Sequence, residues 1–475
     1  MKPFGLKEAL ERFDDMPDSD GARTRFLKIL ALKAHRLCGG KTRLLPSVAQ
    51  MNPEWLGVWY TPGVSSISTA IRDQEGESLE LTMRGSTVAV ISDSTRVLGD
   101  GDCTPPGGMG VMEGKALLMA WLGGLNAVPL CVNTRNQRGE SDPGKLVEFV
   151  LAASPSFGAV NLEDISQPNC YRVLDELRRR SPIPVWHDDA QGTACVMLAG
   201  LLNALEVTGR TLSESRVVFL GAGAACSASA RLLIEAGVQP GMISMFDGIG
   251  ALVPGRADFQ GEGFAWHREL CAITNPQGFS SIGEALGGAD VLLAASAPGL
   301  VRREWISGMN PKPIVFACAN PVPEIYPRIA LEAGAAVVAT GRSDLPNQVN
   351  NCLGFPGILK GVLLSGAKAI TEGMAVAAAK AIAAEGRKGE FNPMNIMPEV
   401  NAPEVHASVA AEVAVQAWKE GLTPGPVNRD AVYRKTIESI RTVRDAHRAM
   451  VEAAVALEVP QAMVEEALSE ALAGP

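Results

Sequence analysis

The sequence has no uninterrupted apolar stretch of about 18 residues, the length that a membrane-spanning helix needs. Its first residues, MKPFGLKEALERFDD, reach charged side chains too early for a secretory signal peptide. It also has no long run of Lys and Arg, and its formal net charge is -9, so the electrostatic attraction that nucleic-acid-binding proteins use is missing. We therefore expect neither a membrane nor a nucleic acid as a partner.

Cysteine pairs with the Cys-x-x-Cys spacing are absent as well, although the chain has 9 cysteines. The neighbourhoods of Cys195, Cys226 and Cys318 are apolar, which is typical of buried, reduced thiols. Reduced thiols predict a cytoplasmic protein.

The composition is that of a large globular protein. At 475 residues the chain exceeds what one hydrophobic core organises, so we expect two or three domains and enough buried interior for an enzyme. Hydrophobic residues make up 47% and charged residues 20%, and 49 glycines indicate many tight turns. Residues 1 to 45 contain a helical pattern, GARTRFLKILALKAH, of the kind used for packing or subunit contact.

Two series of strands and helices follow one another along the chain. The first contains the short apolar runs STVAVISD, NAVPLCV, FGAVNLEDI and IPVWHDD, separated by helical patterns, which predicts a parallel sheet. The second begins at SRVVFLGAG and continues through MISMFDG, ADVLLAASAPG, KPIVFACANP and AAVVATGRSD. Such a series is typical of a doubly wound nucleotide-binding sheet. After FPG at 355–357 the chain becomes rich in Ala and helical.

A glycine-rich turn opens the second series. The strand SRVVFL runs into GAGAAC at 221–226 and then into the helical pattern SASARLLIEAG, which is the context of a dinucleotide fingerprint. Glycines at such a turn let backbone amides and a helix N-terminus approach a pyrophosphate. Cys226 stands at the third position, where Gly or Ala is usual. The turn predicts a dinucleotide site at Gly221, Gly223, Ala224 and Ala225.

Asp247 closes the next strand, MISMFD. A carboxylate at this point of a Rossmann-type sheet can accept hydrogen bonds from the adenosine ribose hydroxyls. The first cation after it in the sequence is Arg256, and a carboxylate with no cation nearby repels the 2′-phosphate of NADP. The pattern therefore favours NAD, with NADP possible; the alternative is that Asp247 only begins a turn.

Two acidic pairs follow neighbouring strands of the first series. Glu163-Asp164 follows AVNL, and Asp188-Asp189 follows PVW, so both pairs lie at one edge of a parallel sheet. Converging carboxylates repel each other unless a cation lies between them, and oxygen ligands suit Mg2+ or Mn2+. The alternative is that each pair caps the helix that follows it. We expect His187 to orient a ligand, or to be a hydrogen-bonded core residue, rather than to bind the metal itself.

Seven motifs along residues 59 to 415 resemble those of the malic enzymes, in the same order and with similar spacing. They are WYTPGV at 59–64, VMEGKA at 111–116, VNLEDI at 160–165, WHDDAQGTA at 186–194, GAGAA at 221–225, ANPVPE at 319–324 and ATGRSDLPNQVNNCLGFPG at 339–357. The resemblance implies oxidative decarboxylation of L-malate to pyruvate and CO2, with reduction of NAD(P).

The resemblance also implies a general base and a general acid. Lys115 would take the proton from the malate C2 hydroxyl, which requires its pKa to fall toward neutrality through burial and a neighbouring divalent cation. Tyr60 would protonate the enolate that remains after CO2 has left. Without the resemblance, Lys115 would be a solvated surface charge and Tyr60 an aromatic packed before a Pro-Gly turn.

By the same resemblance, Glu163, Asp164 and Asp189 bind the metal, and Asp188 holds Lys115 in place. The groups implied for the carboxylates of the substrate are Arg96, Asn320 and Asn351, with Asn320 also at the cofactor. A surface role is the alternative for Arg96.

The chain departs from the family in one loop. Where the family typically has GLG followed by Asn or Asp, this sequence has Gly99-Asp100-Gly101-Asp102-Cys103-Thr104-Pro105-Pro106. We expect this loop to face the active site and to influence the choice between malate and a substituted malate.

The predicted fold class is α/β: a doubly wound, Rossmann-type NAD-binding domain plus a second α/β domain for substrate and metal, with helical terminal segments. The predicted boundaries are 1–45 for the N-terminal helical segment, 46–189 for the substrate and metal domain, 190–350 for the Rossmann domain and 351–475 for the C-terminal helical region, whose first part completes the catalytic domain. We expect a homodimer or homotetramer, as is usual in resembling proteins.

Two other functions remain open from the sequence alone. A malolactic enzyme of the same family would convert malate to lactate and CO2 with bound NAD. A non-catalytic nucleotide-binding protein would keep the fold and lose the chemistry, but Lys115, Tyr60 and the carboxylates are all present.

Overall fold

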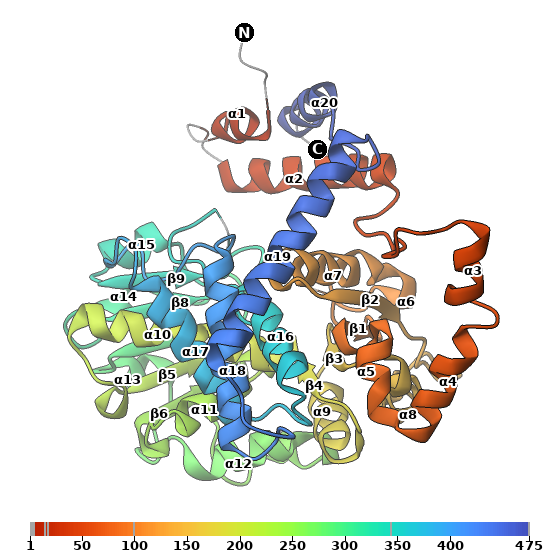
Figure 1. The fold of residues 1–475 in the computed structure, drawn as a ribbon. Coiled ribbons are helices and arrows are strands. Elements are labelled where there is room, and N and C mark those ends of the chain that lie inside the picture. Colours follow the sequence, from red (N-terminus) through yellow and green to blue (C-terminus); the bar gives the residue numbers. More distant parts are fainter. Residues whose placement is uncertain (1–4, 14–15, 17–18, 98–99, 343, 474–475) are drawn as a thin grey trace. The chain divides into compact units, whose positions relative to one another are not determined.

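The computed structural model describes residues 5–13, 16, 19–97, 100–342 and 344–473, which form two units (Figure 1). One unit comprises residues 1–46 and 441–475, and the other comprises residues 47–440. Some predicted features lie outside the described residues: Gly99 and Ser343 in the motifs, and 1–4, 14–15, 17–18 and 474–475 in the terminal segments.

The first sheet of residues 47–440 is parallel, with the strand order β2-β1-β3-β4. Its strands are β1 (Thr87–Ser92), β2 (Asn126–Cys131), β3 (Ala159–Leu162) and β4 (Val185–His187). The helices α7 (Met109–Gly123), α8 (Pro143–Ala153) and α9 (Asn169–Arg180) connect successive strands. Since the strands are parallel, the residues that follow β1, β3 and β4 gather at one edge of the sheet.

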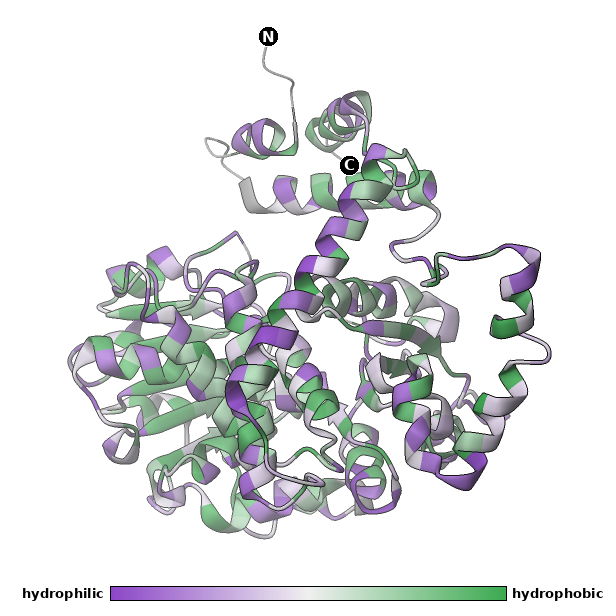
Figure 2. Cartoon of the chain, in the orientation of Figure 1, coloured by the Kyte–Doolittle hydropathy of each residue, from purple (hydrophilic) through white to green (hydrophobic). Residues whose placement is uncertain are grey.

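The second sheet is also parallel, with the order β6-β5-β7-β8-β9. Its strands are β5 (Val217–Leu220), β6 (Ile243–Phe246), β7 (Val291–Ala294), β8 (Ile314–Ala317) and β9 (Val337–Thr340), and its connecting helices are α11 (Ala224–Glu235), α12 (Ala265–Ile273), α13 (Ile282–Leu286), α14 (Arg303–Ser307) and α15 (Pro327–Glu332). The order reverses between β5 and β7, where doubly wound sheets bind ligands. The predicted fold class is confirmed. Figure 2 shows these strands largely in the hydrophobic colour, as expected for strands buried on both faces.

Buried helices join the two sheets into one hydrophobic core. They are α10 (Thr193–Thr208), α16 (Phe355–Ser365), α17 (Glu372–Gly386) and α18 (Pro403–Lys419). Residues Asp188–Thr208 are long and apolar enough to cross a membrane, but 78% of that apolar window is buried inside the protein. This segment therefore lies in the core of the protein, as an apolar helix of a globular fold does.

The remaining helices lie outside this core. Residues 47–440 include α3 (Pro53–Trp59), α4 (Val64–Asp73), α5 (Ser78–Leu81) and α6 (Thr104–Gly107), and α19 (Arg429–Glu452) begins in this unit and ends in the other. The smaller unit contains α1 (Leu6–Glu11), α2 (Ser19–Cys38) and α20 (Gln461–Leu472), packed around buried Phe13 and Phe26.

Candidate active site

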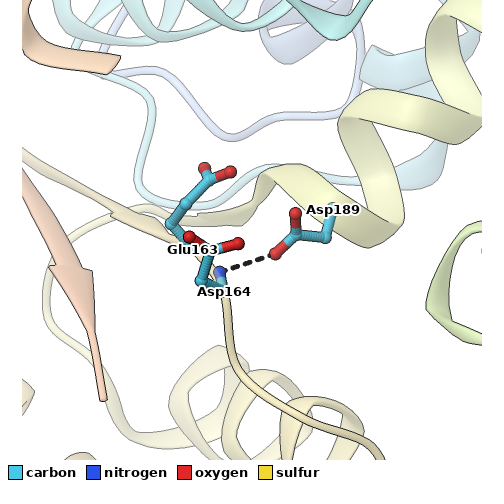
Figure 3. Close-up of side chains that lie close together, drawn as sticks. All are labelled: Glu163, Asp164 and Asp189. Atoms are coloured by element: carbon cyan, nitrogen blue, oxygen red, sulfur yellow. Dashed lines mark hydrogen bonds between the residues drawn. The ribbon is translucent and has the colours of Figure 1, made fainter. Parts of the chain in front are cut away.

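The two acidic pairs meet at the carboxyl ends of β3 and β4. Glu163 and Asp164 follow β3, and Asp188 and Asp189 lie in a turn of π-helix, Asp188–Gly192, between β4 and α10. Carboxylate oxygens of Glu163, Asp164 and Asp189 all lie within 4.8 Å of one another (Figure 3). A divalent ion with metal–oxygen bonds of about 2.0 to 2.6 Å fits such a spacing.

The backbone holds Asp164 and Asp189 together. Asp164 has φ 54°, a left-handed conformation that is uncommon for residues other than glycine. Its amide donates to Asp189 Oδ2 at 2.7 Å, the bond drawn in Figure 3, and its carbonyl accepts from the amide of Arg96 at 3.1 Å. Backbone hydrogen bonds of Asp164 therefore fix the positions of these two carboxylates relative to each other.

Lys115 on α7 is buried beside these carboxylates. Its Nζ lies 3.0 Å from Glu163 Oε1, forms an ion pair with Asp188 and stands 4.7 Å from the centre of the Phe355 ring. The alternative of a solvated surface lysine is therefore wrong. A lysine enclosed by carboxylates and an aromatic ring is a candidate for proton transfer.

Burial lowers the pKa of Lys115, but the charges of Asp188 and Glu163 raise it by more, so the pKa lies above its ordinary value. The expectation that this pKa falls toward neutrality includes a divalent cation beside the amine, so it stays a prediction; the chain's own carboxylates, at ion-pair distance, act in the opposite direction. Burial raises the pKa of Glu163 and of Asp188, while the charge of Lys115 lowers both.

Asp188 is fixed from several sides. Its Oδ1 accepts from Trp186 Nε1 at 3.1 Å, and a Cβ on Gly192 would lie 1.9 Å from the same oxygen, so only glycine allows this approach. The same Cβ would lie 3.3 Å from the Cβ of Asn351, which places Asn351 beside Asp188. The structure thus brings Asn351, a predicted substrate residue, to the acidic cluster.

Three neighbours of the cluster were missed by sequence reasoning. Asn161 donates to Glu163 Oε2 at 3.1 Å, Trp186 donates to Asp188, and Phe355 covers Lys115. Asn161 could have been recognised from the sequence, since it is a polar residue inside the apolar run AVNL. His187 is buried, and its Nδ1 lies 3.9 Å from Asp189 Oδ2, too far for a hydrogen bond.

The donor set fits a divalent cation. Four carboxylates face one buried ammonium group, so the site carries an excess of negative charge, and the three converging side chains offer only oxygen. Hard cations such as Mg2+ and Mn2+ prefer these ligands.

The glycine-rich turn lies at the switch point of the second sheet. Gly221 has φ 122°, and a Cβ there would lie 2.5 Å from the carbonyl oxygen of Ala295, which follows β7. Gly223 precedes α11, which begins at Ala224 and continues through Ala225. The amides at this helix N-terminus can receive a pyrophosphate.

Asp247 follows β6, as predicted, but it has a cation beside it. Arg256 forms two hydrogen bonds with the carboxylate, Nη1 to Oδ1 at 3.0 Å and Nη2 to Oδ2 at 2.7 Å, and it also pairs with Asp258. Burial raises the pKa of Asp247, but Arg256 and the amides of the turn lower it further, so the net shift is downward. The expectation that no cation lies near Asp247 is wrong, because the chain folds back between residues 247 and 256.

The other predicted residues lie as follows. Asn320 is exposed after β8, with Nδ2 at 3.5 Å from Cys318 O. The side chain of Arg96 is exposed, although its amide bonds to Asp164. Tyr60, at the end of α3, is 72% exposed. In the unusual loop, Asp102 pairs with Arg135 and accepts from the amide of Thr104 at 3.0 Å.

Comparisons with known proteins match this chain to one family of enzymes. The family model of the malic enzyme NAD binding domain matches residues 190–418, and that of the malic enzyme N-terminal domain matches residues 40–178. The chain is 42% identical over 385 residues to an NAD-dependent malic enzyme of Geobacillus stearothermophilus, covering 81% of this chain and 78% of the relative. It is 40% identical over 407 residues to the bifunctional malic/malolactic enzyme of Bacillus subtilis, covering 86% and 97%. The crystal structure of Entamoeba histolytica malic enzyme is similar with a TM-score of 0.93 at 48% identity, covering 97% of this chain and 96% of that chain.

Proposed function

Because the chain belongs to the malic enzyme family, we propose that it catalyses the oxidative decarboxylation of L-malate to pyruvate and CO2 with reduction of NAD or NADP. The observation that carries this proposal is Lys115, an amine buried at 3.0 Å from Glu163 and paired with Asp188, at the edge of a cluster of three converging carboxylates. An amine in this position can exchange a proton with a substrate oxygen that is bound at the cluster.

In this proposal Lys115 takes the proton of the C2 hydroxyl as the hydride leaves C2 for the nicotinamide. Asp188 keeps the amine pointed at the substrate, and the hydrogen bond from Trp186 and the absence of a side chain on Gly192 keep Asp188 in place. Tyr60 then protonates the enolate carbon once CO2 has left.

Glu163, Asp164 and Asp189 are the proposed ligands of Mg2+ or Mn2+. When bound, the cation would supply Lewis acidity at the substrate oxygens and a positive charge that favours the neutral form of Lys115. Asn351, which lies beside Asp188, is proposed to bind a carboxylate of malate, together with Asn320 and Arg96.

The glycine-rich turn is the proposed pyrophosphate site, with Asp247 at the adenosine ribose and Asn320 near the nicotinamide. NAD remains the favoured cofactor for a revised reason. The Arg256 side chain is 8% exposed and gives its donors to Asp247, Asp258 and two carbonyl groups of the turn, so it has little left to offer a 2′-phosphate. The partial neutralisation of Asp247 by Arg256 weakens its repulsion of NADP, so the preference is modest.

We also propose that the enzyme works in the cytoplasm as a homo-oligomer. The predicted domain division, 46–189 for substrate and metal and 190–350 for the cofactor, is kept as a proposal. The unusual loop, anchored by Asp102 and Arg135, is the place to look for a preference for substituted malates.

The experiment is a spectrophotometric assay at 340 nm with L-malate, NAD or NADP, and Mn2+ or EDTA. We expect NADH formation that depends on both malate and Mn2+, at a higher kcat/KM with NAD than with NADP. Lys115→Ala should lower kcat by about 10²- to 10⁴-fold, the usual contribution of a general base. Glu163→Gln should raise the Mn2+ concentration needed for half-maximal rate.

The matched control is Lys388→Ala, which removes an exposed lysine whose one ion pair with the described residues is to Glu385, three residues earlier in the sequence. Its rate should equal that of the wild type. If turnover is unaffected by EDTA, or if Lys115→Ala retains full activity, the proposed function is wrong.

A malolactic reaction is the second candidate, since the Bacillus subtilis relative carries both activities in its name. The same reaction mixtures separate the two. Pyruvate formed in step with NADH supports the oxidative reaction, whereas lactate formed without net NADH supports the malolactic one.

A further inference from the structure

Glu324 closes the motif ANPVPE as a buried carboxylate, with 0% of its surface exposed. Its Oε1 accepts from the amide of Ser296 at 2.6 Å and from the hydroxyl of the same residue at 3.1 Å. Its Oε2 accepts from the amide of Ala319 at 3.0 Å. Burial of a carboxylate is costly, and these three hydrogen bonds offset that cost.

The carboxylate joins the loops that follow two neighbouring strands. Ser296 comes shortly after β7 and Ala319 shortly after β8, and these two strands pair in parallel. The backbone reinforces the junction, since the amide of Val301 donates to the carbonyl oxygen of Glu324 at 3.1 Å. Parallel strands of a doubly wound sheet end at the edge where ligands bind. Glu324 therefore fixes the spacing of two loops at this edge.

Both loops contact groups of the proposed cofactor site. The loop after β7 begins with Ala295, whose carbonyl oxygen would lie 2.5 Å from a Cβ on Gly221 in the glycine-rich turn. The loop after β8 carries Asn320 directly after the bonded amide of Ala319. A Cβ on Gly341 would lie 2.7 Å from Asn320 Nδ2, so the side chain of Asn320 lies close against the exit of β9. Through these two loops, Glu324 sets the position of Asn320 relative to the glycine-rich turn.

We infer that Glu324 is a positioning residue for the nicotinamide half of the cofactor. By accepting from the amide of Ala319, it holds Asn320 at the place where the nicotinamide binds. This inference rests on the proposed function, in which Asn320 lies near the nicotinamide. Because none of its surface is exposed, Glu324 acts through the loop and does not touch the ligand.

Glu324→Gln changes the hydrogen bonds with almost no change of shape. A carboxylate only accepts, whereas a carboxamide accepts at its oxygen and donates at its nitrogen. We expect the Gln oxygen to keep the shorter amide bond, to Ser296, so that its nitrogen faces the N–H of Ala319. Two donors then oppose each other beside Asn320, while the loop that contacts the glycine-rich turn stays bonded.

The test measures binding in the absence of turnover. NADH and ADP are titrated separately into the full chain by isothermal titration calorimetry, because ADP is the cofactor without its nicotinamide riboside. We expect Glu324→Gln to raise the Kd of NADH by about 10-fold, the effect of one buried donor left without an acceptor, and to leave the Kd of ADP unchanged. An unchanged Kd of NADH would overturn the inference. An equal rise for both ligands would also overturn it, since that result indicates a general disturbance of the sheet.

Glu332→Gln is the matched control. It makes the same chemical change at an exposed carboxylate of α15, which pairs with Arg328 at 2.7 Å and with Arg303 at 3.5 Å. Both Kd values should equal those of the wild type. Urea unfolding of the Glu324→Gln chain separates positioning from a merely structural role: a lower midpoint with an unchanged Kd of NADH would mean that Glu324 only stabilises the fold.

Glu324→Asp is the second variant, and it replaces Glu324→Gln if that chain does not fold. It keeps the carboxylate but is one methylene shorter, so it can reach one loop and not both. We expect the same rise in the Kd of NADH at an unchanged Kd of ADP, and an unchanged Kd of NADH would overturn the inference here too.

The same measurements separate this inference from the proposed function. A wild type that shows the expected difference in NADH binding but does not turn over malate would overturn the proposed function alone. Turnover of malate, with equal affinity for NADH in the wild type and in Glu324→Gln, would overturn the inference alone. A wild type that does not bind NADH would overturn both.

Discussion

Lys360 lies on α16, where its amine is enclosed by protein. It is 5% exposed, and its Nζ donates to Gly124 O at 3.2 Å and to Ser439 Oγ at 2.9 Å. Burial lowers the pKa of Lys360 to about 8, and the charge of Lys435 contributes in the same direction. Neither bond involves a carboxylate, so the charged form is poorly compensated.

The pKa of Lys360 makes folding stability depend on pH. Below pH 8 the amine is charged in both states, and the buried charge opposes folding by about 3 kcal/mol. Between pH 8 and about 10.5 the folded chain holds fewer protons than the unfolded chain, so stability rises with pH and the penalty disappears. We expect the stability of Lys360→Met relative to wild type, measured by urea unfolding, to fall by about 2 kcal/mol between pH 7.5 and 9.5. Lys388→Met, at an exposed position, should show no such change; a flat difference for Lys360→Met would contradict the prediction.

At the scale of residues, the sequence predicts the position of a side chain when that position follows from the neighbouring residues in the chain. The acidic pairs could be placed because each directly follows a strand, and parallel strands end at one edge. The contact of Arg256 with Asp247 could not, because it depends on the path of the intervening turn. The contact of Lys115 with Asp188 was implied by the resemblance, but the approach of Glu163 Oε1 to 3.0 Å from the amine was not predicted, because it depends on how α7 packs beside β3.

At the scale of elements, α16 and α18 approach closely where α16 has glycine. A Cβ on Gly361 would lie 2.3 Å from Ala410 O, and a Cβ on Gly357 would lie 2.7 Å from His406 O. Both neighbours are backbone atoms of α18 and cannot move aside without shifting the helix. The two glycines therefore set the distance between the helices.

Gly361→Ala tests this packing. Alanine favours an isolated helix by about 1 kcal/mol over glycine, but the overlap with Ala410 O forces the helices apart, and overpacking of this kind destabilises by about 1 to 3 kcal/mol. We expect a lower urea midpoint for Gly361→Ala. Gly110→Ala on α7 is the matched control, because a Cβ there meets nothing within 4 Å, and its midpoint should stay unchanged or rise. Equal midpoints for the two variants would show that the helices adjust freely.

The strands and their parallel order were predictable from short apolar runs alternating with helical patterns. The close approach of α16 and α18 could not be predicted, because a glycine inside a helical pattern does not indicate which helix packs against it. The exposure of residues 51–76 was also missed, since only coordinates show that none of these residues is buried.

At the scale of the whole molecule, the two ends of the chain form their own small core. Among the residues that the structure describes in this unit, the buried members of its core lie in segments 9–30 and 464–471, and Phe13 packs on Phe26 with ring centres 5.6 Å apart. Lys33 pairs with Glu466 at 3.1 Å and with Glu470 at 2.9 Å. A helical segment was predicted at each end, but their pairing could not be, because nothing local connects residues more than 400 positions apart.

This separate core predicts local unfolding. Phe26→Ala should destabilise the unit by about 3 to 5 kcal/mol, since it removes a fully buried aromatic ring. In hydrogen–deuterium exchange with mass spectrometry, we expect faster exchange in α1, α2 and α20 and unchanged exchange in α10 and α16, because local stability follows the core to which a segment contributes. Leu32→Ala, at an exposed position of α2, should leave all five helices unchanged. If Phe26→Ala accelerates exchange equally in α10 and α16, the two units unfold together and the division of the chain at residues 46 and 441 has no thermodynamic meaning.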